Sequence, residues 1–224
     1  MLVAAALLLL GGCDLLFQID GVELHPDATA GSPVDAAPQA DAHANCLTDG
    51  FATLGGAWTT FAEPPMTAVA VDGALSITLN QAANAHAGLD SVTGDFTGAS
   101  SQVDIVAVPD AASETYMDWQ RGDDWYSIAV DHGELSYGFS VGGSQSTIEI
   151  PYSPDRHRGF RIAHDRQANL IRMSVRSSSG EWSQLGTVPV AIPMAALSVE
   201  LASGSYTSAT TTGVARFDNF VFCF

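Results

Sequence analysis

The chain has 224 residues, of which 25 are Asp or Glu, 8 are Arg and none is Lys, so its formal net charge is −17. Binding to nucleic acid requires a basic surface, and we therefore expect no nucleic acid partner. Apolar residues make up 46% of the chain, which is enough to bury a core and excludes disorder of the whole chain.

The first thirteen residues have the pattern of an export signal. An apolar run, LVAAALLLL, occupies residues 2–10 and is followed by Gly11, Gly12 and Cys13. The run is too short to cross a bilayer as a helix and is typical of the apolar part of a secretory signal. The segment LGGC, which ends at Cys13, resembles the lipobox of bacterial lipoproteins, although only Met1 stands where that family has basic residues.

The resemblance implies that the thiol of Cys13 is acylated and that the chain is cleaved before it. Acyl chains anchor proteins in membranes because each buried methylene contributes about 0.8 kcal/mol. We therefore expect a lipid-anchored protein of the bacterial cell envelope, attached to the inner or the outer membrane through Cys13. A buried apolar helix with an incidental Cys is the alternative.

The sequence predicts three consecutive regions. Residues 1–12 are the predicted signal peptide, residues 13–44 the lipidated N-terminus and a flexible tether, and residues 45–224 a single folded domain. The tether is predicted from residues 26–44, which are rich in Ala, Asp and Pro and contain no aromatic residue. Such a segment buries too little surface to offset the entropy lost on ordering it.

Two further cysteines, Cys46 and Cys223, stand at the two ends of the predicted domain. In an exported protein an even number of remaining cysteines favours a disulfide. Such a bond requires the first and the last segment of the domain to be neighbours. Two free, buried thiols are the alternative.

Ten runs rich in β-branched and aromatic residues predict strands. They cover residues 74–79, 102–108, 115–120, 125–131, 134–141, 147–150, 160–164, 170–176, 197–201 and 215–224. Turn-forming residues separate several of these runs, at 121–124, 132–133, 142–145, 165–169 and 177–180. Only residues 194–201 also fit a short helix. The spacing predicts an all-β, two-sheet antiparallel sandwich of about ten to twelve strands.

Two segments carry a resemblance to a known family. Residues 160–182, which end in Ser179-Gly180-Glu181-Trp182, resemble the S-x-D-G-x-W hairpin of concanavalin A-like and laminin G-like domains. Ser179 stands where that family often has an acidic residue. Residues 215–221 (ARFDNFV) are similar to the closing strand of those domains. The resemblance implies a concanavalin A-like jelly roll, a fold found in lectins and glucanases, with adjacent first and last strands.

The sequence predicts no catalytic site. Glycoside hydrolases of this fold share a strand motif, E-x-D-x-E or E-x-D-x-x-E, that places two carboxyl groups on one face, and this motif is not present here. We expect Asp118, grouped with Asp123 and Asp124, and the pair Asp131 and Glu134 to be solvated acids at strand ends and turns. The sequence also lacks a G-x-S-x-G nucleophile motif.

No cofactor is predicted. The His and Cys residues lack the paired spacing typical of metal sites. Some lectin-like relatives bind calcium through Asp and Asn side chains, for which Asp95, Asp123 and Asp124 are candidates. Nothing else in the sequence supports a calcium site.

Arginines are concentrated in one predicted hairpin: six of the eight lie between residues 156 and 176. Strand alternation places Arg161 and Arg172 close together on its polar face, where like charges repel unless an anion or a carboxylate lies between them. In one interpretation, acids of a neighbouring strand such as Asp118 or Glu149 pair with these arginines. In the other, the face binds a sugar or an anionic glycan.

The binding interpretation needs aromatic side chains on which a sugar can stack. Trp119, Trp125 and Tyr126 are the candidates, although packing in the core is the ordinary role of each. The predicted ligand face comprises Asp118, Trp119, Trp125, Arg161 and Arg172.

Together these features predict a non-catalytic envelope lipoprotein whose sandwich domain binds carbohydrate or another extracellular partner, such as an envelope protein. A purely structural or adhesive envelope component is the first alternative. A carbohydrate-active enzyme is the second.

The lipid anchor is testable in cells. A Cys13→Ser variant, or treatment with globomycin, is expected to abolish metabolic labelling by palmitate, because the acceptor thiol or its processing is lost. Labelling is followed by autoradiography of the immunoprecipitated protein. Unchanged labelling would show that Cys13 is not the lipid attachment site.

Overall fold

The computed structural model describes residues 45–224, apart from residues 81–82, 110–111 and 206–211. The predicted signal peptide, Cys13 and the tether lie outside the described residues. The described part contains no helix long and apolar enough to cross a membrane.

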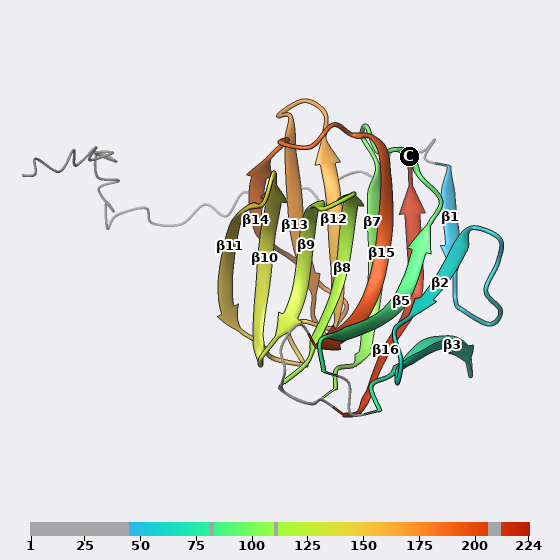
Figure 1. Ribbon diagram of the computed structural model, residues 1–224. Helices are drawn as coiled ribbons and strands as arrows, with labels where there is room; N and C mark the ends of the chain where they lie inside the picture. Colours follow the sequence, from blue (N-terminus) through green and yellow to red (C-terminus); the bar gives the residue numbers. More distant parts are fainter. Residues whose placement is uncertain (1–44, 81–82, 110–111, 206–211) are drawn as a thin grey trace, which may run out of the picture. The chain divides into compact units, whose positions relative to one another are not determined.

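The described residues form sixteen strands in two antiparallel sheets that pack face to face (Figure 1). Sheet A contains β1 (Cys46–Asp49), β3 (Thr67–Val71), β4 (Ala74–Thr78), β7 (Ser100–Ala107), β12 (Gly159–Asp165), β13 (Leu170–Arg176), β14 (Trp182–Pro189) and β16 (Val214–Cys223). Its order is β14-β13-β12-β7-β16-β4-β3, and β1 also pairs with β16.

Sheet B contains β2 (Trp58–Ala62), β5 (Ala85–Ser91), β6 (Gly94–Asp95), β8 (Glu114–Arg121), β9 (Asp124–Asp131), β10 (Glu134–Val141), β11 (Ser144–Pro151) and β15 (Ala195–Ser205). Its order is β11-β10-β9-β8-β15-β5-β2, and β6 also pairs with β15. The predicted fold class, an all-β antiparallel sandwich, is confirmed.

Three tight hairpins build one half of sheet B. Two-residue turns join β8 to β9, β9 to β10 and β10 to β11. In the second turn His132 and Gly133 both have positive φ, and in the third Gly142 and Gly143 do. Two consecutive residues with positive φ match the right-handed twist of the flanking strands, which explains why these turns are visible in the sequence.

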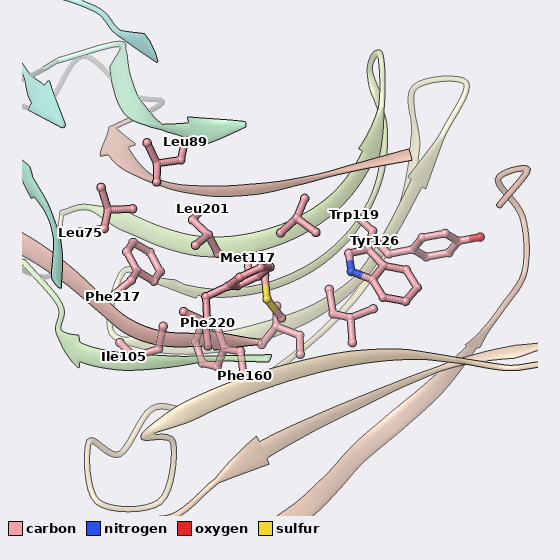
Figure 2. Packing of buried hydrophobic residues seen from close by; sticks show 14 of the residues in the cluster. Leu75, Leu89, Ile105, Met117, Trp119, Tyr126, Phe160, Leu201, Phe217 and Phe220 are labelled. Atoms are coloured by element: carbon pink, nitrogen blue, oxygen red, sulfur yellow. The ribbon is translucent and has the colours of Figure 1, made fainter. Parts of the chain in front are cut away.

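The core lies between the sheets and is built from alternate residues of each strand (Figure 2). Sheet A contributes Leu75, Ile105, Phe160 and Phe217, all of them buried. The opposing residues of sheet B include Leu89, Met117, Trp119, Tyr126 and Leu201. The remaining residues of each strand therefore point away from the core.

Residues 194–201, which also fit a helix by sequence, form most of β15. This strand lies between β8 and β5 in sheet B, where it pairs with both. The sequence misses β1, β2, β3, β5, β6 and β14. Strands β5 (AHAGLDS) and β14 (WSQLGTVP) are rich in Gly, Ala and polar residues, so their conformation depends on pairing with neighbours rather than on local preference.

The two ends of the domain meet in sheet A. Strand β1 pairs antiparallel with β16, and Cys46 lies directly opposite Cys223. These two cysteines form the disulfide that their number indicates, across 177 residues of sequence. The bond therefore joins the first and last strands of the sandwich.

Replacing both cysteines by alanine is expected to lower the free energy of unfolding by up to about 5 kcal/mol, because the crosslink restricts a very long loop of the unfolded chain. Urea unfolding followed by tryptophan fluorescence measures the loss. Wild-type protein in reductant serves as the control and should behave like the double variant. Equal unfolding midpoints for oxidised wild type and variant would contradict a stabilising role for the disulfide.

Candidate functional site

The structure separates the residues of the predicted ligand face. Asp118 and Trp125 lie on β8 and β9 of sheet B, and alternation turns both away from the core. Trp119 is 0% exposed and packs inside the sandwich (Figure 2). Its indole nitrogen donates a hydrogen bond to Ser101 Oγ at 2.6 Å. Arg161 and Arg172 belong to sheet A. The five residues therefore do not form one surface.

Tyr126, also considered for stacking, has a structural role as well. Its ring is buried in the core, and its hydroxyl accepts hydrogen bonds from the backbone N–H groups of Ala191 and Ile192, at 2.7 and 2.8 Å. The hydroxyl thus holds the segment that leads into β15.

The arginines on the outer face of sheet A find partners within that sheet. Arg161 donates two hydrogen bonds to Gln102 Oε1, at 3.1 and 2.6 Å, and its guanidinium carbon lies 3.9 Å from the centre of the Trp182 ring. Arg172 pairs with Asp165. The predicted pairing with Asp118 or Glu149 is wrong, because both of those acids belong to sheet B.

Arg176 completes this network by pairing with Asp104. Its guanidinium carbon lies 5.5 Å from the centre of the Trp182 ring, so two arginines contact one indole. Sequence reasoning quoted Trp182 only as part of a motif and did not place it near the arginines. Because β13 and β14 are neighbours, it lies directly opposite Arg176.

A different cluster occupies the outer face of sheet B. Asp90 of β5, Glu200 of β15 and Asp118 of β8 are direct cross-strand partners, and Ser127 of β9 continues the line. Cross-strand partners have Cβ atoms about 5 Å apart. We call Asp90, Glu200 and Asp118 the carboxylate row.

Aromatic and small residues border the carboxylate row. Tyr116, two residues before Asp118 on β8, packs with Ala129, Ala202 and Phe61 on the outer face. The hydroxyl of Tyr116 donates a hydrogen bond to Glu200 Oε1 at 2.5 Å. On the other side of the row, Gln120 donates to Asp90 Oδ1 at 2.8 Å, and half-buried Trp125 lies opposite Gln120.

The two central acids of the row are almost completely buried: Asp118 is 8% exposed and Glu200 7%. Burial raises the pKa of Asp118 well above its ordinary value, and the nearby Glu200 and Glu114 raise it further, whereas a hydrogen bond with Ser127 opposes the shift. Burial also raises the pKa of Glu200, against the hydrogen bond from Tyr116. One carboxyl oxygen of Asp118, Oδ1, has no hydrogen-bond partner.

Glu114 extends the acidic surface toward the start of β8. It lies four residues before Asp118 on the same face. Burial, followed by the charges of Asp131 and Glu200, raises its pKa to about 7. Asp90 also has a raised pKa, because burial outweighs its hydrogen bond with Gln120.

The expectation that Asp118 is a solvated acid near a turn is wrong: it lies in the middle of a strand and is buried. The sequence did show that Asp118 and Glu114 share a face of one strand, through the alternating pattern Glu114-x-Tyr116-x-Asp118. A search for E-x-D-x-E does not find this pattern, because its central residue is Tyr. Glu200 carried no such signal, because its proximity to Asp118 depends on the pairing of β15 with β8.

The calcium candidates do not meet at one site. Asp123 is exposed in the turn between β8 and β9, and the Asp124 carboxylate accepts a hydrogen bond from the Gly142 backbone N–H at 2.7 Å. Asp95 accepts one from the backbone N–H of Thr97 at 2.9 Å. Within the described residues, no group of three or more His, Cys, Asp and Glu side chains is placed to hold a metal ion.

No protein-family model and no curated protein matches the sequence. Solved structures do match. The transglycosylase Crh5, in complex with NAG, superposes with a TM-score of 0.59 and 12% identity, over 80% of this chain and 83% of its own. The acidic lectin of winged bean, complexed with methyl-α-D-galactose, matches with a TM-score of 0.53 and 11% identity, over 80% of this chain and 98% of its own.

The CBM2 module of the evolved Dit of Lactobacillus casei BL23 phage J-1 also matches, with a TM-score of 0.53 and 9% identity, over 80% of this chain and 96% of its own. The domain is a lectin-like jelly-roll sandwich. Identities this low show the fold alone, which lectins, carbohydrate-binding modules and glycosidases share.

The raised pKa of Glu114 predicts a pH-dependent stability. Its pKa rises from 4.5 to about 7 on folding, so the folded state holds a proton that the unfolded state releases between these values. The contribution of Glu114 to stability is therefore full below pH 4.5 and is lost as the pH rises through about 7. Between pH 4.5 and pH 8, the free energy of unfolding of a Glu114→Gln variant should fall by on the order of 2 kcal/mol less than that of the wild type.

Urea unfolding at pH 4.5, 6 and 8 measures the difference between the two proteins. Burial lowers the pKa of His157, which gives an opposite slope, but that slope is common to both proteins and cancels in the comparison. Glu134→Gln, an exposed acid at the start of β10, is the matched control. Parallel stability curves for wild type and Glu114→Gln would overturn this assignment.

Proposed function

We propose that the protein is a lipid-anchored component of a bacterial cell envelope that binds carbohydrate on the outer face of sheet B. The observation that carries the proposal is the buried carboxyl of Asp118, whose Oδ1 atom has no hydrogen-bond partner in the part of the chain that the structure describes. An unsatisfied buried polar atom costs about 1–3 kcal/mol, and a ligand that donates a hydrogen bond removes that cost.

The surroundings of Asp118 suit a sugar. Carboxyl groups accept hydrogen bonds from hydroxyls, and the carboxylate row offers several such acceptors side by side. Half-buried Trp125, next to the row, provides aromatic surface on which the C–H face of a sugar ring can pack, whereas Tyr116 is 5% exposed and serves to hold Glu200. Apolar surface combined with a few convergent polar groups is the usual composition of a small-ligand site.

The structural comparisons support the same class of ligand. One matched structure is a transglycosylase in complex with NAG, another is a lectin complexed with a galactoside, and a third is a CBM2 module. The predicted signal sequence and Cys13 support an envelope location. A tether of residues 13–44 would connect the sandwich to the membrane.

A second candidate function is a carbohydrate-active enzyme. The observation in its favour is the pair Glu114 and Asp118, which stand four residues apart on one face of β8. Glycosidases use two carboxyl groups that face the same bond, one of them a general acid with a raised pKa. With a pKa of about 7, Glu114 has the protonation behaviour that such an acid requires.

Binding is tested by retention of the full-length chain on a panel of insoluble polysaccharides. We expect specific retention by at least one of them, and about tenfold weaker binding for Asp118→Asn and for Trp125→Ala, since each removes a contact of the proposed site. Asp123→Asn is the matched control for charge, because Asp123 is an exposed acid in the adjoining turn. Arg161→Ala is the control for sheet A.

Retention that Asp118→Asn leaves unchanged would overturn the proposed site. No retention by any polysaccharide, together with a defined protein partner in crosslinking, would favour a structural or adhesive role. Turnover of a chromogenic glycan that is lost in Glu114→Gln would establish the enzymatic candidate.

A further inference from the structure

The outer face of sheet B is acidic and carries no arginine. Its acids come from six consecutive strands of the sheet: Asp90 on β5, Glu200 on β15, Glu114 and Asp118 on β8, Asp131 on β9, Glu134 on β10 and Glu149 on β11. Seven of the eight arginines lie outside the strands of sheet B, and the chain has no lysine. The eighth, Arg121, is the last residue of β8. It lies two residues after Trp119 and so on the same side of the sheet as Trp119, opposite to Asp118.

Two histidines stand at the margin of this face, and each contacts an acid. Nδ1 of His86, on β5, lies 3.0 Å from Glu63 Oε2, and the side chain of His132, in the turn between β9 and β10, contacts Asp131. Neither histidine is a cross-strand partner of Asp118 or Glu200, whose partners on this face are Asp90 and Ser127. His86 nevertheless acts on two acids of the row, since its charge lowers the pKa of Glu200 and of Asp90. The groups that shift the pKa of Asp118 include no cation: they are burial, Ser127, Glu200 and Glu114.

Such an arrangement is costly when the acids are charged. Carboxylates directly opposite each other on neighbouring strands repel, and burial weakens the screening of that repulsion. Burial is the main reason that the pKa values of Asp118, Glu200 and Glu114 are raised, and the charges of neighbouring acids add to it. A cation bound against them would take the place of the protons that these acids retain.

We propose that the carbohydrate site on sheet B selects an amino sugar whose free amine is protonated, with the ammonium group held between Asp118 and Glu200. This inference rests on the proposed carbohydrate binding and names its ligand class. An ammonium group offers three N–H donors, and Asp118 Oδ1 is an acceptor that none of the described residues uses. Charge-assisted hydrogen bonds of this kind are about twice as strong as neutral ones.

The same charges disfavour other sugars. An anionic glycan would meet seven acids on this face and no arginine, so like-charge repulsion opposes its binding. Neutral sugars avoid that repulsion but leave the ionised acids uncompensated. The sequence-based idea of an anionic glycan held by Arg161 and Arg172 concerned sheet A, where both arginines already have partners.

Binding of the amino sugar should be coupled to the release of protons. The bound ammonium lowers the pKa of the neighbouring acids, so complex formation releases protons. Affinity is expected to increase as the pH rises from 5 toward 7 and the acids ionise, and to fall at higher pH once the amine of the sugar loses its proton. The other titratable groups on this face also contribute to the total proton count: Asp90, Asp131, Glu134, Glu149 and the marginal His86 and His132.

Three β-1,4-linked hexasaccharides test the proposal, because they differ only in the substituent at C2: a hydroxyl in cellohexaose, an acetamido group in the hexamer of N-acetylglucosamine, and an ammonium in the hexamer of glucosamine. Each is titrated calorimetrically into the full-length protein at pH 6.5, in two buffers of different ionisation enthalpy and at two salt concentrations. We expect the glucosamine hexamer to bind at least tenfold more tightly than the other two. Its binding should release protons and weaken with salt.

Asp118→Asn and Glu200→Gln are expected to abolish this preference, whereas Asp123→Asn, which removes an equal charge from the exposed turn, retains it. Thermal unfolding of each variant establishes that it is folded. If one of the two buried variants does not fold, the other and Glu114→Gln take its place. A preference that survives in every folded variant of the row would overturn the assignment.

The failures of the two proposals are distinguishable. Equal affinities for the three hexasaccharides would overturn amino-sugar selectivity and leave carbohydrate binding intact. No binding of these sugars or of the polysaccharide panel would overturn both. A hexalysine peptide that binds as tightly as the glucosamine hexamer would show a general site for cations and would also overturn the selectivity proposed here.

Discussion

The position of β15 between β8 and β5 is the constraint on which both the fold and the candidate site depend. On one side β15 places Leu201 opposite Met117, so the core continues across the sheet. On the other it places Glu200 between Asp118 and Asp90. The hydrogen bond from Tyr116 to Glu200 links the two strands on the outer face. One pairing therefore builds the core and assembles the acids.

The two outer faces of the sandwich satisfy their charges in different ways. On sheet A, Arg161, Arg172 and Arg176 each contact an acid or amide of the same sheet, and Trp182 covers part of the charge. On sheet B, Asp118 Oδ1 has no donor among the described residues. A face whose charges are already paired has little to gain from a ligand, whereas a buried carboxyl oxygen without a partner can gain a hydrogen bond. This difference, more than the number of charged residues, distinguishes the two faces.

Local pattern and the tertiary arrangement agree where neighbours in sequence are neighbours in space. The meander β8–β9–β10–β11 was predicted nearly strand for strand, because short turns with Gly and His at positive φ connect strands that alternate clearly. Strands β5 and β14 were missed, since their small and polar residues favour no conformation by themselves. Arg161 and Arg172 drew attention because they are close in sequence. Their partners Gln102 and Asp165 were not proposed, and Gln102 is brought close by the pairing of β7 with β12.

The sequence by itself determined the fold class, the hairpin turns and the pairing of Cys46 with Cys223, because alternation, turn chemistry and the number of cysteines are properties of the chain that need no distant contacts. It also contained the alternation of Glu114, Tyr116 and Asp118. Only the tertiary structure decided which of the two faces is the candidate site. Strand order is set by the packing of two sheets against each other, so the partners of Asp118 come from β5 and β15, segments about thirty and eighty residues away in the chain. The burial that shifts the pKa of these acids likewise arises only once the strands are assembled.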